Sequence, residues 1–409
     1  MSNSSKIYDF VVVGAGIAGS CTAYFLSKKT KNILIVDKNS TFANGASGAA
    51  GAFLNPILGK PNDFKDLVTK ALEFSVDFYT SNLSNLTNFS EFISTSGTLR
   101  VATDDEDFEK FCSYEEFIDF DYEKRDEGYF FPIGSMVNAT KVCETLLENI
   151  NQKYDYEVKT LQKKDDFWLI NDEIKTKNIV LTTGANIKLI EEEYVNIRPV
   201  WGQKINVLTS TKTDFNYHKE CSISVSTAHN NKYKLSIGAT HNRFKEDMSD
   251  TLYNLNLKDI NDIQPNQKTV DIVNSDTKKL IDLANDIIKL DDIEIIDFKI
   301  GARAASFDYF PIVGKLVDSK KTIENHPHIL NGSHIKKDKL SMIDNLYIIN
   351  GVGGRGYVLS PYLAKVLVES IFDGVELNEN ISSYRLFKRW AKRLKGKNRW
   401  LKIVLKLWF

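Results

Sequence analysis

The chain has 409 residues, 42% of them hydrophobic and 11% aromatic, so it is long enough for two or three domains and has the composition of a folded globular protein. Its formal net charge is −1, and its four cysteines are scattered without a CxxC pair. This argues against a disulfide framework, a zinc site or another metal site, and it predicts a cytoplasmic location. No stretch approaches the roughly 18 uninterrupted apolar residues of a membrane span, so we expect no integral membrane association.

The first predicted element is a unit of strand, turn, helix and second strand in YDFVVVGAGIAGSCTAYFLSKKTKNILIVDK, residues 8–38. Gly14, Gly16 and Gly19 have GxGxxG spacing, which allows a tight turn, the approach of a pyrophosphate and close packing of helix on strand. The helix N-terminus offers unpaired N–H groups to phosphates. Asp37 follows the second strand, where it can accept hydrogen bonds from a ribose diol, and this favours FAD or NAD over NADP.

Three later segments favour FAD, because they place small residues along the path of a long cofactor. The loop NGASGAAGAFLNP (44–56) follows the second strand, and the strand KNIVLTTGAN (177–186) ends in a Thr-Gly pair. Near the C-terminus, NLYIINGVGGRGYVLSPYLAKVLVESI (345–371) predicts a strand, a glycine-rich turn and a helix, whose backbone N–H groups could meet a flavin. A cofactor that both ends of the chain contact must be long, as FAD is.

The chain ends in a strongly basic run. From residue 380 onwards there are ten Lys or Arg and no Asp or Glu, so the other residues carry 43 basic and 54 acidic side chains. The run predicts a helix that is solvated, lies on a membrane surface or grips nucleic-acid phosphates. Its apolar face would consist of Leu386, Phe387, Trp390, Ala391 and Leu394, and its phosphate-binding residues would be Lys388, Arg389, Lys392 and Arg393.

The order GxGxxG, ASG, TTGA, RPVWGQ, GARAASFDYFPIVG, GGRG resembles the D-amino-acid oxidase and glycine oxidase superfamily along nearly the whole chain. GASGAAGAFLNPIL, IGATHNRF and GVGGRGYVLSPYLAKVL, followed by LFKRWAKRLKGK, more specifically resemble the FAD-dependent half of the bifunctional tRNA methylaminomethyl-uridine biosynthesis proteins (MnmC). The dinucleotide motif begins eight residues from Met1, so the methyltransferase half of that family is not expected here. A separate methyltransferase that acts on the product is left open as a partner, beside tRNA itself.

The resemblance implies an α/β fold: a Rossmann-like FAD-binding domain of the D-amino-acid oxidase and glutathione-reductase type, with an inserted antiparallel-sheet substrate domain. Strands of that sheet are expected in KINVLTS (204–210) and KYKLSIGAT (232–240). The expected ranges are 1–82, 130–198 and 299–378 for the FAD-binding domain, 83–129 and 199–298 for the substrate domain, and 379–409 for the basic tail.

The resemblance also implies the site residues. Arg303 aligns with the superfamily arginine that grips a substrate carboxylate, Arg355 would stabilise a reduced flavin, and Gln203 would face the flavin; these are the predicted catalytic residues. His241 and Arg243 would line the substrate mouth. The predicted FAD contacts are Gly14, Gly16, Ile17, Ala18, Gly19, Asp37, Lys38, Ala46, Ser47, Gly48, Val158, Thr183, Gly184, Gly353, Gly354, Arg355, Gly356 and Tyr357.

The implied reaction is oxidative removal of the carboxymethyl group from a carboxymethylaminomethyl-uridine, with or without 2-thiolation, at the tRNA wobble position. Its products would be aminomethyl-uridine, glyoxylate and, after reoxidation by oxygen, hydrogen peroxide. No motif identifies a general base. Two alternatives stay open. One is an oxidase of a free amino acid or N-substituted glycine such as sarcosine, since Arg303 would serve either substrate. The other is a flavin-containing structural subunit whose tail binds a partner or a membrane.

Overall fold

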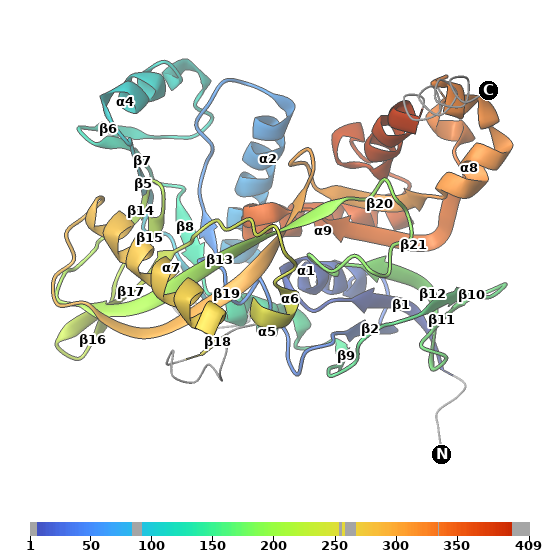
Figure 1. Ribbon diagram of the computed structural model, residues 1–409, viewed down its shortest axis with the longest axis horizontal. Coiled ribbons are helices and arrows are strands. Elements are labelled where there is room, and N and C mark those ends of the chain that lie inside the picture. The colour runs from blue at the N-terminus through green and yellow to red at the C-terminus, as the bar shows by residue number, and fades with distance from the viewer. Residues whose placement is uncertain (1–5, 84–91, 253–255, 258–266, 334, 395–409) are drawn as a thin grey trace, which may run out of the picture.

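The structure is a computed structural model that describes residues 6–83, 92–252, 256–257, 267–333 and 335–394. It contains two large β-sheets that lie on either side of one cavity, and a small third sheet (Figure 1). None of the helices in these ranges is both long and apolar enough to cross a membrane.

The first sheet has eight strands and a parallel centre. Its order is β10-β11-β12-β1-β2-β9, and β21 and then β20 continue it from β12. Parallel pairs join β1 to β2 and β12, β2 to β9, and β12 to β21. The strands are β1 (Ile7–Val13), β2 (Ile33–Val36), β9 (Asn151–Lys153), β10 (Leu161–Lys163), β11 (Trp168–Ile170), β12 (Ile174–Leu181), β20 (Ile312–Val317) and β21 (Met342–Asn350).

Alternation along β1 gives each face of this sheet its own core. Phe10 and Val12 belong to a cluster that includes helices α1, α2, α5 and α9, whereas Val11 and Val13 contact a second cluster on the other face. The helices are α1 (Ile17–Ser27), α2 (Asp63–Asp77), α5 (Ala139–Leu147), α8 (Ser319–Asn325) and α9 (Gly356–Phe372). Short helices are η1 (Phe78–Asn82), η4 (Pro327–Asn331), η5 (Lys337–Lys339), η6 (Gly353–Arg355) and η7 (Glu379–Ile381).

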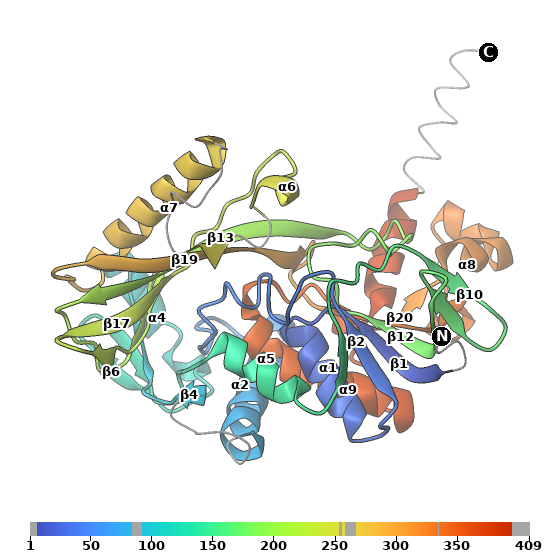
Figure 2. The same ribbon diagram turned by 90° about the horizontal axis from the view of Figure 1, so that it is seen from below.

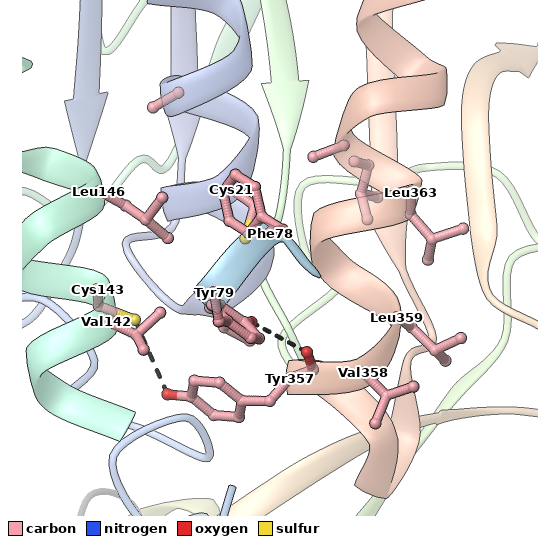
Figure 3. Packing of buried hydrophobic residues seen from close by; sticks show 14 of the residues in the cluster. Cys21, Phe78, Tyr79, Val142, Cys143, Leu146, Tyr357, Val358, Leu359 and Leu363 are labelled. Carbon is pink, nitrogen blue, oxygen red and sulfur yellow. Dashed lines mark hydrogen bonds between the residues drawn. The ribbon is translucent and has the colours of Figure 1, made fainter. Parts of the chain in front are cut away.

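Figure 3 shows the centre of the first cluster, where the start of α9 meets α5 and η1. The buried hydroxyl of Tyr79 donates to the backbone carbonyl of Tyr357 at 3.0 Å. The hydroxyl of Tyr357 lies 2.9 Å from the carbonyl oxygen of Ala139 and 3.1 Å from that of Ser47. These contacts fix the start of α9 against a loop that lines the cavity.

The second sheet has ten strands and is antiparallel except for the β5–β14 pair. Its order is β18-β19-β13-β17-β15-β14-β5-β7-β6, with β16 on β17. The strands are β5 (Thr98–Val101), β6 (Glu123–Arg125), β7 (Gly128–Phe131), β13 (Ile197–Thr209), β14 (Asn216–His218), β15 (Ser222–Ile223), β16 (Thr227–His229), β17 (Lys232–Gly238), β18 (Asn256–Leu257) and β19 (Glu294–Ser306). The strands expected over 204–210 and 232–240 correspond to the second half of β13 and to β17.

Helix α7 (Gln267–Asn285) packs on one face of the second sheet, and the α/β layer lies on the other side (Figure 2). Smaller elements complete the fold: α4 (Asp105–Cys112), α6 (Ser249–Leu252), η2 (Glu115–Phe117) and a third sheet of β3 (Phe53–Leu54), β8 (Ser135–Val137) and β4 (Ile93–Ser94).

The strands β13 and β19 pair from Ile197 opposite Ser306 to Leu208 opposite Glu294. Both run unbroken through the positions where the sequence places a domain boundary, at 198/199 and 298/299. Interior residues of both strands, Gly202 and 301–304, line the cavity, and α7 packs on the opposite face of the same sheet (Figure 2). One pair of strands therefore belongs to both parts of the molecule.

Candidate active site

A cavity of about 940 Å³ lies between the carboxyl ends of the parallel strands and the near face of the second sheet. The first sheet contributes the residues that follow β1, β2, β12 and β21. The second sheet contributes residues of β5, β13, β14 and β19. Ligand sites of open α/β sheets lie at the carboxyl ends of their strands, so the position itself marks a binding site.

The turn after β1 is shaped to hold a phosphate. Gly14 has a φ of 109°, and a Cβ there would lie 2.5 Å from the carbonyl oxygen of Thr182. Gly16 is the N-cap residue of α1 and supplies no side-chain cap, so the positive end of the helix dipole faces the cavity. Ser47 Oγ accepts a hydrogen bond from the Ile17 N–H at 2.9 Å, which joins this turn to the small-residue loop.

Asp37 lies at the end of β2, on the wall of the same cavity. Its Oδ2 accepts from the backbone N–H of Ala15 at 2.6 Å, and its Oδ1 accepts from the backbone N–H and side-chain amide of Asn39, both at 2.9 Å. Burial raises the pKa of Asp37 despite these donors. The carboxyl is thus fixed in place beside the turn, as a ribose-binding acid must be.

A second glycine-rich turn, between β21 and α9, closes the cavity from the C-terminal part of the chain. Gly353 has a φ of 57°, and no atom lies within 4 Å of a Cβ built there. Open space likewise surrounds Gly184, which follows β12 with a φ of 60°. The hydroxyl of Thr183, buried beside it, makes no hydrogen bond. An unsatisfied buried hydroxyl and two open glycine turns fit a polar, ring-bearing ligand.

Arg303 projects from β19 across Gly202, where a Cβ would lie 2.5 Å from the guanidinium. One guanidinium nitrogen donates to the Thr240 carbonyl at 2.9 Å. Burial lowers the pKa of Arg303 to about 10, and within the described ranges no acidic side chain forms an ion pair with it. Leaving a buried charge without a partner is costly, so the site favours an anionic ligand.

The model of the FAD dependent oxidoreductase family matches residues 9–370, which include both glycine turns and Arg303. The chain belongs to this family. It is therefore an FAD-dependent oxidoreductase, and we propose that the cavity is its flavin site. The open glycines, the unpaired Thr183 hydroxyl and the fixed Asp37 all fit that cofactor.

Curated relatives of this oxidoreductase are tRNA 5-methylaminomethyl-2-thiouridine biosynthesis bifunctional proteins MnmC. That of Campylobacter fetus subsp. fetus is 23% identical over 385 residues, which cover 90% of this chain and 57% of the relative. That of Marinobacter nauticus is 23% identical over 392 residues, which cover 88% of this chain and 55% of the relative. The chain thus spans a little over half the length of these relatives.

Solved structures share the fold. Glycine oxidase from Bacillus cereus superposes with a TM-score of 0.67 at 16% identity, covering 90% of this chain and 96% of that one. Iminodiacetate oxidase from Chelativorans sp. BNC1 superposes with a TM-score of 0.63 at 16% identity. The match covers 91% of this chain and 98% of the iminodiacetate oxidase chain. The predicted α/β fold with an added substrate sheet is confirmed by this family.

The structure brings most of the predicted FAD contacts to the cavity wall. Those that line it are Gly14, Gly16, Ile17, Ala18, Asp37, Lys38, Ala46, Ser47, Val158, Thr183, Gly184, Gly353, Gly354, Arg355, Gly356 and Tyr357. Gly19 and Gly48 do not line it. A Cβ on Gly19 would lie 1.8 Å from the Gly14 carbonyl oxygen, and one on Gly48 would lie 2.1 Å from the Ala43 carbonyl oxygen. Both glycines allow backbones to pack closely behind the site.

Gln203 is placed away from the flavin site, contrary to its predicted position. Along β13, Gly202 faces the cavity, so the next side chain points to the opposite face of the sheet. There Gln203 is fully buried under α7, and its amide donates to the Val273 carbonyl at 3.1 Å and to the Thr277 hydroxyl at 2.6 Å. These contacts indicate that Gln203 joins the sheet to the helix.

His241 lines the cavity, but Arg243 is an exposed residue outside the lining. Partial burial and the nearby Arg303 lower the pKa of His241 to about 4. The imidazole is therefore neutral at physiological pH and adds no positive charge beside Arg303. Arg355, the other predicted catalytic arginine, lines the cavity, and burial lowers its pKa.

The cavity residues that the sequence-based prediction missed include two that can carry charge, Arg100 of β5 and His218 of β14. They face each other in the register of the parallel β5–β14 pair. Burial and the charge of Arg355 lower the pKa of Arg100 to about 10, and its Nε makes no hydrogen bond. Burial also lowers the pKa of His218, whose Nδ1 lies 2.7 Å from the Ser222 hydroxyl oxygen. Together with Arg303 and Arg355, Arg100 makes the cavity strongly cationic.

The basic run is a helix over residues 383–394 as far as the structure describes it, and residues 395–409 lie outside that part. Leu386, Phe387 and Ala391 are buried in the second cluster of the first sheet. This apolar face is covered by the protein, which contradicts its use on a membrane surface. None of the four predicted phosphate-binding residues lines the cavity; Lys388 lies 3.6 Å from Glu379, and Arg389, Lys392 and Arg393 are exposed.

We expect the bound FAD to leave the protein on denaturation. The cysteine that lines the cavity, Cys221, has its pKa raised to about 12 by burial, so its thiol stays protonated and is a poor nucleophile for a covalent link. The purified protein should be yellow, and filtration after denaturation should recover the colour in the filtrate. Flavin that remained on the denatured chain would contradict this and would implicate Cys221 or a cavity histidine.

Proposed function

We propose that this oxidoreductase removes the carboxymethyl group from carboxymethylaminomethyl-uridine, or its 2-thio form, at the wobble position of tRNA. The products are aminomethyl-uridine and glyoxylate. The observation that carries the proposal is the buried, acid-free guanidinium of Arg303 beside the second glycine turn, where its Cδ lies 3.7 Å from a Cβ built on Gly354. The names of the curated relatives supply the tRNA context.

Arg303 is suited to hold the carboxylate of an N-substituted glycine. The Thr240 carbonyl takes one of its N–H groups and fixes the plane of the guanidinium, which leaves other donors for a bidentate contact. The carboxylate would neutralise the buried charge, and the bond to be oxidised, which lies one carbon away, would be held in one position. Arg355 and Arg100 add positive charge to the same wall, where it would stabilise negative charge on a reduced cofactor.

FAD, when bound, would supply the acceptor for two electrons and a proton from the carbon–nitrogen unit of the substrate. Water then adds to the resulting carbon–nitrogen double bond, which splits into a primary amine on the uridine and glyoxylate. Molecular oxygen takes up the two electrons and two protons as hydrogen peroxide. The amine must be uncharged to react, and neutral His241 and His218 are compatible with that state because neither brings a proton to the cavity at physiological pH.

Anaerobic mixing tests the proposal. Reduction of the flavin is followed by its absorbance after addition of tRNA that carries carboxymethylaminomethyl-uridine, unmodified tRNA, sarcosine or glycine. We expect rapid bleaching with the modified tRNA, slow bleaching with sarcosine and none with unmodified tRNA. Glyoxylate should form in an amount equal to the flavin reduced. Rapid bleaching by sarcosine or glycine with no reaction of modified tRNA would contradict the assignment.

That contradictory outcome would support the second candidate, an oxidase of a free amino acid or small N-substituted glycine. Arg303 favours it equally, because it would hold the carboxylate of any glycine derivative. If the tRNA reaction is correct, a methyltransferase on another chain would be the enzyme that consumes the primary amine.

A further inference from the structure

Two aromatic side chains lie exposed in the turn that follows β19, directly after the strand that carries Arg303. Phe307 is 46% exposed and Tyr309 is 61% exposed, which makes Tyr309 the most exposed large hydrophobic residue in the described part of the chain. Exposing two neighbouring aromatic rings costs solvation free energy and adds nothing to a core. Because these exposed rings lie in the turn that follows the Arg303 strand, they are candidates for contact with a bound ligand.

Three arginines surround Phe307 with their guanidinium groups over its ring. The guanidinium carbons of Arg198, Arg389 and Arg393 lie 5.3, 5.7 and 5.2 Å from the ring centroid. Arg198 belongs to β13, and the other two belong to the helix over 383–394, which stands beside the ends of β13 and β19 (Figure 2). All three arginines are exposed, so their donors also face solvent.

Asp308, the acidic residue in this turn, is already paired with arginines of the C-terminal helix. Asp308 accepts two hydrogen bonds from Arg385, at 3.0 and 3.1 Å, and lies 3.6 Å from Arg389. The bidentate pair with half-buried Arg385 fixes the turn to the C-terminal helix. Arg198 and Arg393, by contrast, form no ion pair with an acid of the described residues, so the surroundings of Phe307 keep a net positive charge.

A hollow of about 370 Å³ connects this turn to the flavin site. It is lined by Phe64, Asp308, Tyr309, Val352, Gly353, Gly354 and Arg355. The last four also line the main cavity. A ligand that lies on Tyr309 is thus in reach of the glycine turn that borders the flavin.

We infer that Phe307, Tyr309, Arg198, Arg389 and Arg393 form a stacking platform for single-stranded RNA, on which a nucleotide adjacent to the reacting one lies. Aromatic faces bind bases of any sequence, and arginines beside them bind the connecting phosphates. This inference rests on the proposed function, since it assigns the part of the substrate outside the cavity. It also gives Arg389 and Arg393 a role on the protein surface rather than in a free arm.

The test is a Phe307→Leu, Tyr309→Leu double variant, which keeps apolar bulk and removes both rings. The probe is an RNA hairpin whose loop carries carboxymethylaminomethyl-uridine. We expect its Kd to rise about 5- to 150-fold, the loss of roughly one stacked base, while kcat/KM for sarcosine stays unchanged. A Phe307→Tyr variant should keep wild-type affinity, because it retains the aromatic face.

Phe372→Leu is the matched control. Phe372 is 42% exposed and has the Lys29 ammonium 5.9 Å from its ring centroid, but it ends α9, whereas the glycine turn precedes that helix. A helix of 17 residues spans about 25 Å, so this ring is remote from the hollow. Its loss should leave the Kd unchanged. In the same assay, Arg198→Gln with Arg393→Gln should flatten the dependence of log Kd on log salt by about 1.4–1.8.

The outcomes separate the two proposals. If wild type binds and oxidises the modified hairpin and the double variant does so equally well, the platform is wrong and the proposed function stands. If wild type oxidises sarcosine but neither binds nor oxidises the hairpin, both are wrong. If anionic lipid vesicles bind to wild type through Phe307 and Tyr309 and the hairpin does not, a lipid surface is the occupant and the RNA platform is overturned.

Discussion

An Arg303→Ala variant is expected to lose about ten- to a hundredfold in affinity for a glycine-type substrate while it keeps its FAD. Hydrogen bonds to a charged group contribute on the order of 1.5–3 kcal/mol, and the bidentate carboxylate contact would be lost entirely. FAD should stay bound because the residues predicted to contact its phosphates and ribose lie at the other glycine turn. Steady-state kinetics with sarcosine and with modified tRNA, together with the flavin absorbance of the purified variant, measure both effects.

Two further variants make this result specific. Arg303→Lys should recover only part of the affinity, because a single ammonium cannot reproduce the planar fork of the guanidinium. Arg243→Ala removes an exposed arginine close in sequence to the cavity but outside its lining, and it should have wild-type kinetics. An unchanged KM in Arg303→Ala would remove Arg303 from the substrate site.

Gly19→Ala is expected to abolish FAD binding and to destabilise the fold. The new Cβ would lie 1.8 Å from the Gly14 carbonyl oxygen and 2.7 Å from the Thr182 hydroxyl, and backbone cannot yield at the first of these contacts. The turn and the helix α1 would have to separate, which disrupts the phosphate site even though Gly19 itself does not line the cavity. Flavin content and the midpoint of thermal unfolding measure the two losses.

Gly374→Asn is the control for that variant. Gly374 has a φ of 71° and nothing lies within 4 Å of a Cβ built there, and asparagine tolerates this left-handed conformation. Its flavin content should equal that of wild type. If Gly19→Ala also bound a full complement of FAD, the close approach of α1 to the turn would not be required for the cofactor.

The nucleotide half of the site was predictable because its determinants are local in the sequence. Gly14, Gly16 and Asp37 belong to one strand–turn–helix–strand unit, in which spacing alone places each residue on the wall of the cavity. Spacing does not distinguish a glycine that contacts the ligand from one that allows two backbones to touch. Gly19 and Gly48 were therefore assigned to the cofactor, whereas the structure gives them a packing role.

The substrate half of the site was harder to predict from the sequence, because its residues are brought together by strands that pair over long sequence separations. Arg100 and His218 are neighbours only through the β5–β14 pair, and both line the cavity that Arg303 also lines. The alternation in β13 contained the information about Gln203: once Gly202 is known to face the site, its neighbour faces away. The position of α7 could not be predicted from the sequence. This helix covers the other face of the sheet and accepts hydrogen bonds from the Gln203 amide.

The basic run illustrates a different limit. Its apolar stripe was predicted correctly, and the structure buries Leu386 and Phe387. The prediction could not identify what the stripe packs against. In the structure it packs on the parallel sheet, which leaves Arg389 and Arg393 at a fixed position beside Phe307.

The shared strands β13 and β19 determine how a large substrate can enter. Since both cross the predicted domain boundary without interruption, a continuous ladder of strand pairing sets the position of Arg303 in the cavity wall. The register shift in this pair, between Asn206 and Val207, lies outside the cavity-lining residues Gly202 and 301–304. On the cavity side of that shift, Gln203 is bonded to α7 and its neighbour Gly202 lines the cavity, so one segment of β13 holds both the helix and the cavity wall. We therefore expect this wall of the cavity to stay in place when a substrate enters, so that under the proposed function a single nucleotide of the tRNA would have to reach Arg303.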